Sequence, residues 1–189
     1  MSIESKKTNW YVITGGPSCG KTTIVNSLKD LGYKTTHEAA RHYIDLQRVN
    51  GKGIDEIREN QRNFQHKILN IQLRLEKNLD PAQIVFLDRA LPDELAYYKY
   101  FQLEPDSKLI EFQNQFSYKK IFILDLLPLH KDYARTEDQS AQIAIQKEII
   151  KVYKSRQDPV MMVPVLSPKE RTQFILDNLF LCKIEINKI

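Results

Sequence analysis

Residues 15–22 read Gly15-Gly16-Pro17-Ser18-Cys19-Gly20-Lys21-Thr22, and this stretch decides the fold. It matches the pattern G-x-x-x-x-G-K-[ST], which forms a phosphate-binding loop when it joins a strand to a helix. The apolar run 10–14 comes directly before it, and apolar residues at helical spacing follow it until Gly32. The sequence therefore predicts a strand, a glycine-rich loop and a helix, in that order.

Backbone N–H groups in such a loop converge on an anion, and the helix adds the positive end of its dipole. The segment is therefore expected to bind the phosphates of ATP or GTP together with Mg²⁺. Lys21 would contact the outer phosphates, and the Thr22 hydroxyl would hold the metal. The alternative is an ordinary glycine-rich turn with a solvated lysine. The predicted nucleotide-binding residues are Gly15, Gly16, Pro17, Ser18, Cys19, Gly20, Lys21, Thr22 and Thr23.

Away from the loop, apolar runs alternate with helical patterns along the chain. Strands are expected at 10–14, 33–36, 83–87, 120–125 and 160–165. Helices are expected after the loop and at about 38–47, 54–79, 92–101, 105–116, 137–153 and 167–181. The last of these has Ser167 as a cap and Glu170 three residues later. The prediction is one α/β domain over 1–189, with a parallel sheet of about five strands and helices on both faces.

Asp88 ends the apolar run 83–87 and is the predicted second metal ligand. A metal beside a phosphate-binding loop usually takes an aspartate from the end of a neighbouring strand. Asp125 occupies the same place after the next apolar run, and a cap for the following helix is an alternative role for Asp88. Arg89 follows at once, where it would neutralise a transferring phosphate or bind an acceptor; a surface salt bridge is the alternative.

Composition indicates an ordinary folded protein rather than a disordered or fibrous one. The 189 residues are 42% hydrophobic and 28% charged, with a net charge of +4. No apolar run approaches the roughly 20 residues that span a bilayer, and a cytoplasmic protein is expected. Basic residues alternate with acidic ones, so no nucleic-acid partner is expected. The two cysteines are expected to be free thiols, and the four histidines lack zinc spacing.

Three further segments accompany the loop: 37–41 (His-Glu-Ala-Ala-Arg), 86–93 (Phe-Leu-Asp-Arg-Ala-Leu-Pro-Asp) and 132–137 (Asp-Tyr-Ala-Arg-Thr-Glu). Together the four resemble the AAA-like P-loop family typified by the nicotinamide riboside kinase domain of the bacterial NAD regulator. The likeness spans about residues 10–180. It implies a P-loop NTPase fold with a doubly wound sheet, a nucleoside triphosphate on the loop, and an acceptor pocket after the second and third strands.

The resemblance also implies roles for individual residues. Glu38 would accept the proton of the acceptor hydroxyl, although a helix-start acid is an alternative role. Arg41, one helical turn later, would face the same cleft or form a surface pair. Asp93 would contact the acceptor or cap its helix. Arg135, in a small helical lid over about 130–157, would place a cation on the moving phosphate.

Two functions fit these features. The first is a Mg-ATP-dependent kinase of a small acceptor such as a nucleoside or a nicotinamide riboside-like molecule. The second is a regulatory module that ATP or GTP switches, with slow hydrolysis. ATP is favoured because the sequence contains no N-K-x-D guanine signature. However, the segment 153–158 lacks the glycine that often follows the family's lid helix, so the choice of base stays open. The oligomeric state is unknown.

Overall fold

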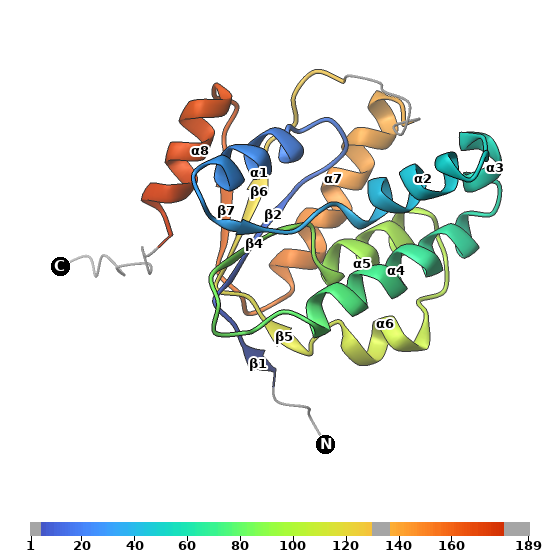
Figure 1. The fold of residues 1–189 in the computed structure, drawn as a ribbon, viewed down its shortest axis with the longest axis horizontal. Helices are drawn as coiled ribbons and strands as arrows, with labels where there is room; N and C mark the ends of the chain where they lie inside the picture. The colour runs from blue at the N-terminus through green and yellow to red at the C-terminus, as the bar shows by residue number, and fades with distance from the viewer. Residues whose placement is uncertain (1–4, 130–136, 180–189) are drawn as a thin grey trace.

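Five parallel strands form the central sheet, in the order β3-β4-β2-β6-β7 (Figure 1). The computed structural model describes residues 5–129 and 137–179. The strands are β2 Trp10–Thr14, β3 Lys34–Thr35, β4 Val85–Asp88, β6 Lys120–Leu124 and β7 Val160–Val163. In the register of the sheet, Val12 lies between Leu87 and Ile121. The predicted parallel α/β sheet of about five strands is confirmed, and β2, which leads into the glycine-rich loop, is its central strand.

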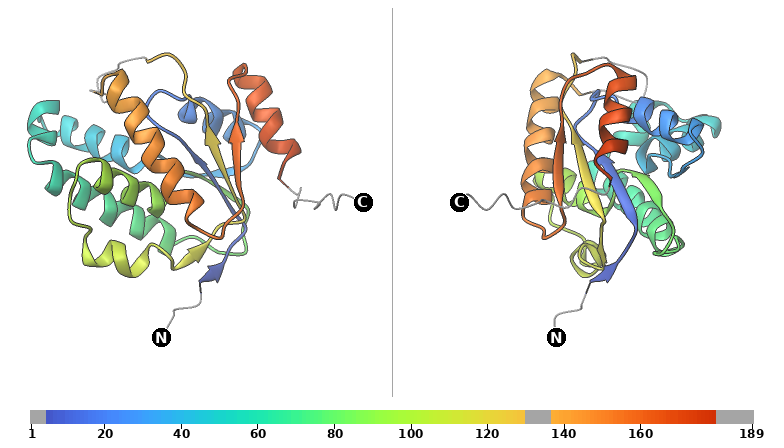
Figure 2. Two further views of the ribbon diagram at one scale, coloured as in Figure 1. Left: turned by 180° about the vertical axis from the view of Figure 1, so that it is seen from behind. Right: turned by 90° about the vertical axis from the view of Figure 1, so that its left-hand side faces the viewer.

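Helices cover both faces of the sheet, as the right-hand view of Figure 2 shows edge-on. α1 and α8 pack together on one face, while α7 and α5 pack together on the other, with α4 against α5. The helices are α1 Lys21–Asp30, α2 Ala39–Val49, α3 Ile54–Arg58, α4 Gln61–Lys77, α5 Leu91–Tyr100, α6 Ser107–Phe112, α7 Gln139–Lys154 and α8 Pro168–Asp177.

The central strand divides its side chains between two cores. Trp10 and Val12 belong to the cluster under α5 and α7, while Tyr11 and Ile13 belong to the cluster under α1 and α8. All four are buried, because successive strand residues point to opposite faces and both faces are covered. This burial explains why the run is apolar throughout rather than alternating.

Three local expectations about secondary structure differ from what is observed. The helix expected at 54–79 is broken into α3 and α4, because Asn60 leaves the helical conformation and its side chain accepts the N–H of Asn63. The helix expected at 105–116 ends at Phe112. Phe116 instead begins β5 (Phe116–Ser117), which pairs with β1 (Lys6–Lys7) in a small sheet that was not predicted.

Part of the range expected to form a lid is a core helix. α7 buries Ile145, Ile149 and Val152 in the cluster under α5, and Figure 1 shows it lying along the sheet. Residues 130–136 lie outside the described residues, so a lid there stays a prediction. None of the helices in the described parts of the chain combines the length and apolar character that crossing a membrane requires.

Candidate functional site

The glycine-rich loop leaves β2 at Thr14 and enters α1 at Lys21, with Gly20 as the residue that caps the helix. Gly15 and Gly20 have φ angles of 142° and 89°, which side chains disfavour. A Cβ atom on Gly15 would lie 2.7 Å from the Cys19 sulfur and 2.8 Å from the Leu124 carbonyl oxygen. The loop therefore needs glycine at Gly15 for space as well as for conformation.

Lys21 is buried beneath the loop, and its Nζ donates to the carbonyl oxygens of Gly15 and Gly16 at 2.9 and 2.8 Å. This places the cation inside the curl of the chain. Its contact with the outer phosphates of a nucleotide stays a prediction. Thr22, the next residue, has a buried hydroxyl oxygen with no hydrogen-bond partner among the described residues. A buried polar atom without a partner is unusual, and it fits an oxygen that ligates an ion.

Two glutamines on α7 hold the loop from one side. Gln146 Oε1 accepts the N–H of Gly16 at 2.6 Å, and Gln142 Nε2 donates to the carbonyl oxygen of Pro17 at 2.9 Å. Both glutamines lie on the buried face of α7. Sequence periodicity assigns apolar residues to that face, so it did not predict these contacts.

Arg171, on α8, holds the loop from the other side. It is 2% exposed, and its guanidinium donates to the carbonyl oxygens of Cys19, Asp125 and Pro164 at 2.7, 2.9 and 2.8 Å. One side chain therefore ties the loop to the ends of β6 and β7. The sequence did not single out this arginine.

Replacing Arg171 with methionine is expected to lower the free energy of unfolding by about 3 kcal/mol, because three carbonyl oxygens lose a charged donor. Urea unfolding measures this loss. Lys169→Met is the matched control, since Lys169 is exposed on the same helix and its loss is expected to cost less than about 0.5 kcal/mol. Equal stability of the two variants would contradict the bracing role.

Asp88 ends β4, next to the loop in the sheet. It is 3% exposed, its Oδ1 has no hydrogen-bond partner among the described residues, and its backbone N–H donates to Thr36. Burial and the Glu38 carboxylate raise the pKa of Asp88 to about 7. Asp88 and Thr22 line one cavity, which we call the α1–α2 cavity. Two unpartnered oxygens in one cavity are a donor set that fits Mg²⁺.

Arg89 follows Asp88 in a left-handed conformation, with φ of 68°, that non-glycine residues rarely adopt. Its Nε donates to Glu38 Oε1 at 3.1 Å, and its Nη1 lies 3.4 Å from Asp93 Oδ1. Its guanidinium also lies 5.1 Å from the centre of the Tyr97 ring. The strained backbone therefore accompanies a buried cation that holds two carboxylates, and strain of this kind is concentrated at functional sites.

Asp93 has the capping role that the sequence left open. It is fully buried, and it accepts the N–H of Ala90 at the start of α5 as well as the hydroxyls of Thr14 and Tyr153. Its oxygens are occupied by donors of the chain itself, and it lines neither of the cavities beside the loop. Asp93 therefore links α5, α7 and β2.

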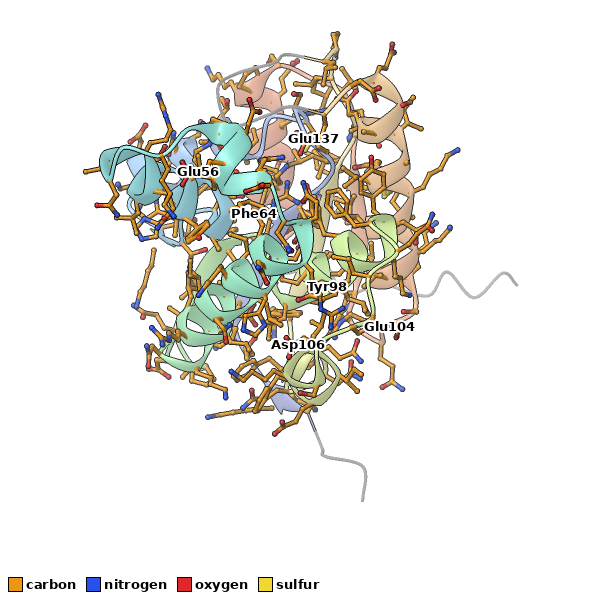
Figure 3. The ribbon with its side chains drawn as sticks, turned by 90° about the vertical axis from the view of Figure 1, so that its right-hand side faces the viewer. Glu56, Phe64, Tyr98, Glu104, Asp106 and Glu137 are labelled. Atoms are coloured by element: carbon orange, nitrogen blue, oxygen red, sulfur yellow. The ribbon has the colours of Figure 1, made fainter. Side chains whose placement is uncertain are left out.

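A second cavity, which we call the α4–α5 cavity, lies beside the first. Most of its lining residues lie in or next to helices α2 to α5, with Pro17 from the loop, Arg89 after β4 and Glu137 before α7. The lining residues are Pro17, Glu38, Ala39, Ala40, Arg41, Ile44, Arg58, Phe64, Gln65, Ile68, Gln72, Arg89, Glu94, Tyr97, Phe101 and Glu137. Figure 3 labels two of them, Phe64 on α4 and Glu137, which precedes α7. Arg58 and Glu137 form an ion pair at 3.1 Å across it. Glu38 and Arg41 line both cavities.

The structure thus brings most of the residues that the sequence singled out to the carboxyl ends of the strands. Lys21, Thr22 and Asp88 lie at the loop, while Glu38 and Arg41 line both cavities. Arg89 lines the α4–α5 cavity and contacts Glu38. Thr23 is exposed on α1. Arg135 lies outside the described residues. The residues that sequence reasoning missed are Gln65, Gln72, Glu94, Gln142, Gln146 and Arg171.

Comparisons with known proteins agree with this architecture. A family model described as an AAA domain matches residues 10–171. No curated protein matches the chain. Deoxyadenosine kinase from M. mycoides has a similar structure, with a TM-score of 0.65, 18% identity, and coverage of 90% of this chain and 97% of the other.

Two further solved structures share the fold. NadR protein in complex with NR gives a TM-score of 0.59 at 18% identity, over 92% of this chain and 48% of the other. Shikimate kinase from Aquifex aeolicus gives 0.53 at 15% identity, over 88% and 94%.

Proposed function

We propose that this chain, which belongs to the AAA domain family, is a magnesium-dependent kinase that transfers a phosphoryl group from ATP to a small acceptor. GTP is the alternative donor. The acceptor is of the nucleoside or nicotinamide riboside class. The observation that carries the proposal is the position of Glu38, because it lines both the cavity with Thr22 and Asp88 and the α4–α5 cavity. A carboxylate between a phosphate site and an acceptor pocket is placed for general base catalysis.

On the nucleotide side, the loop's N–H groups and Lys21 bind the phosphates. Lys21 exchanges its two loop carbonyls for phosphate oxygens. Thr22 and Asp88 hold Mg²⁺, which neutralises charge on the phosphate oxygens when it is bound. Positioning and electrostatic stabilisation supply most of the rate in phosphoryl transfer, and these residues serve both.

On the acceptor side, Glu38 takes the proton of the attacking hydroxyl. Arg89 positions the Glu38 carboxylate, because its guanidinium contacts both Glu38 and Asp93. Asp93 is itself held by the N–H of Ala90 at the start of α5. Arg41 lines both cavities and adds a positive charge beside the acceptor. In this proposal Arg135 supplies a further cation to the moving phosphate.

The similar structures support a kinase without identifying the acceptor. Deoxyadenosine kinase, shikimate kinase and the NadR protein share the fold. The names of the first two refer to chemically different small molecules, and the third was solved in complex with NR. Because one fold serves several acceptors, the acceptor of this chain must be inferred from its own pocket.

The test is nucleotide consumption by the pure protein with Mg-ATP or Mg-GTP and a panel of acceptors. The panel contains the common nucleosides, nicotinamide riboside and shikimate. One acceptor is expected to raise turnover at least about tenfold above basal hydrolysis. If nucleotide binds and changes the protein's shape while no acceptor alters turnover, the protein is a switch module and the kinase proposal is wrong.

A further inference from the structure

Glu94, in the first turn of α5, is a buried acid that has no role in the proposed reaction. It is 4% exposed, it lines the α4–α5 cavity, and its Oε2 has no hydrogen-bond partner within residues 5–129 and 137–179. Its neighbour Asp93 has the N-terminal capping contacts, so Glu94 is not needed to begin the helix. Buried carboxyl oxygens are ordinarily bonded, and an unbonded one beside a cavity indicates a partner that enters from outside the chain.

The charge state of Glu94 narrows the choice of partner. Burial and the Asp93 carboxylate raise the pKa of Glu94 to about 8, and Arg89 opposes the rise. Glu76 and Glu38 add further repulsion. Near pH 7 the group is therefore mostly a neutral carboxylic acid, which offers one donor and one acceptor side by side.

The walls around Glu94 are aromatic and aliphatic. Phe64, Tyr97 and Phe101 line the cavity with rings, and Ile44 and Ile68 add apolar surface. Such walls favour a flat ring over a highly hydroxylated acceptor. Gln65, which is also buried, adds a side-chain amide to the same cavity.

We infer that the α4–α5 cavity binds a planar heterocycle with a hydrogen-bond donor beside an acceptor on one edge, and that Glu94 recognises this edge. The class includes nucleobases such as adenine and cytosine, and a ring carboxamide. The inference rests on the proposed function, since the ring belongs to the acceptor whose hydroxyl faces Glu38. Glu94 is then a recognition residue that selects the acceptor.

Entry of the ring requires movement at the mouth of the cavity. The cavity measures about 50 Å³, whereas a cavity of roughly 150 Å³ binds benzene. Arg58 pairs with Glu137 and also lies 5.3 Å from the centre of the Phe64 ring, so separation of this pair widens the cavity beside an aromatic wall.

The experiment compares acceptors that differ only at the edge, using wild type, Glu94→Leu and Glu94→Gln. The matched pairs are adenosine and purine riboside, cytidine and 2-pyrimidinone riboside, and nicotinamide riboside and pyridine riboside. Calorimetric binding and acceptor-dependent turnover are both measured. These arms separate a nucleobase from a ring carboxamide as the group recognised.

In the wild type, the acceptor that carries the donor and acceptor edge is expected to bind about 30-fold more tightly than the matched compound that lacks it. The compound without the edge would leave the buried Glu94 carboxyl unpaired. Glu94→Leu is expected to abolish that preference. Glu94→Gln is expected to keep it within about threefold, because a carboxamide also offers a donor and an acceptor. Glu94→Leu is expected to unfold at a temperature no lower than wild type, because Oε2 has no bond within the described chain to lose.

Each other outcome has a definite meaning. Binding preferences that survive Glu94→Leu, or a lower unfolding temperature without a change in preference, overturn the inference. Turnover with shikimate alone overturns it and leaves the kinase intact. Glu94-dependent binding of an edge-bearing ring without turnover supports the inference and rejects the kinase. No binding by any ring rejects the inference.

Discussion

Replacing Lys21 with methionine is expected to slow phosphoryl transfer by about 10³-fold. Lys21 is the cation enclosed by the loop, with its Nζ held by the carbonyl oxygens of Gly15 and Gly16. Methionine keeps the length of the side chain and removes the charge. The charge that develops on the transferring phosphate then has no cation within the loop. Single-turnover kinetics with saturating nucleotide and acceptor measures the loss.

Lys29→Met is the matched control, since Lys29 is exposed near the end of the same helix. It is expected to leave turnover within about twofold of wild type. Because Lys21 is also buried, thermal unfolding is measured for both variants, so that loss of folding is distinguished from loss of chemistry. A folded Lys21→Met variant with wild-type turnover would rule out phosphate binding by the loop as drawn here.

Glu38→Gln is expected to lower kcat by about 10³-fold while KM for the nucleotide changes less than about twofold. The amide keeps the shape of the side chain and an oxygen for the Arg89 Nε–H, which Glu38 accepts at 3.1 Å. It cannot take the acceptor proton. The effect should therefore fall on the chemical step and leave nucleotide binding intact. Steady-state kinetics with the identified acceptor, varying each substrate in turn, makes the separation.

The control for this variant is Glu111→Gln, an exposed acid on α6 away from both cavities. An equal fall in kcat for the two variants, or a rise in the nucleotide KM without a fall in kcat, would show that Glu38 is not the base. Basal hydrolysis without acceptor is expected to change little in Glu38→Gln, because no acceptor hydroxyl is present for Glu38 to deprotonate.

Much of the fold was predictable because strands buried on both faces have continuous apolar sequences. The runs 85–87 and 121–124 are apolar throughout, which is typical of strands covered on both sides. Ser167 and Glu170 form the capping box that their spacing predicts. Helix breaks were harder to predict. Asn60 interrupts an apolar pattern that continues at the same spacing on both sides, so periodicity alone could not find it.

The site was predictable where a residue follows a strand and was not where a residue faces inward from a helix. Asp88 and Arg89 stand at the end of β4, and strand ends meet at the loop. Asp93 and Glu94 are adjacent acids, and their roles differ because α5 begins at Leu91. That start gives the first acid the N–H of Ala90 and turns the second toward the cavity. A shift of one residue in the helix start would change this division, and no local pattern fixes it.

The amides of Gln142 and Gln146 limit how far the chain can be shortened from its C-terminal side without loss of contacts to the loop. The eight-residue motif near the N-terminus is held in shape by α7 and α8, more than a hundred residues downstream. A fragment that contained the entire motif but stopped before α7 would leave the N–H of Gly16 and the carbonyl oxygen of Pro17 without these partners. The smallest fragment that keeps all the contacts holding the loop in shape therefore extends through α8, and the motif placed alone in another scaffold would lack them.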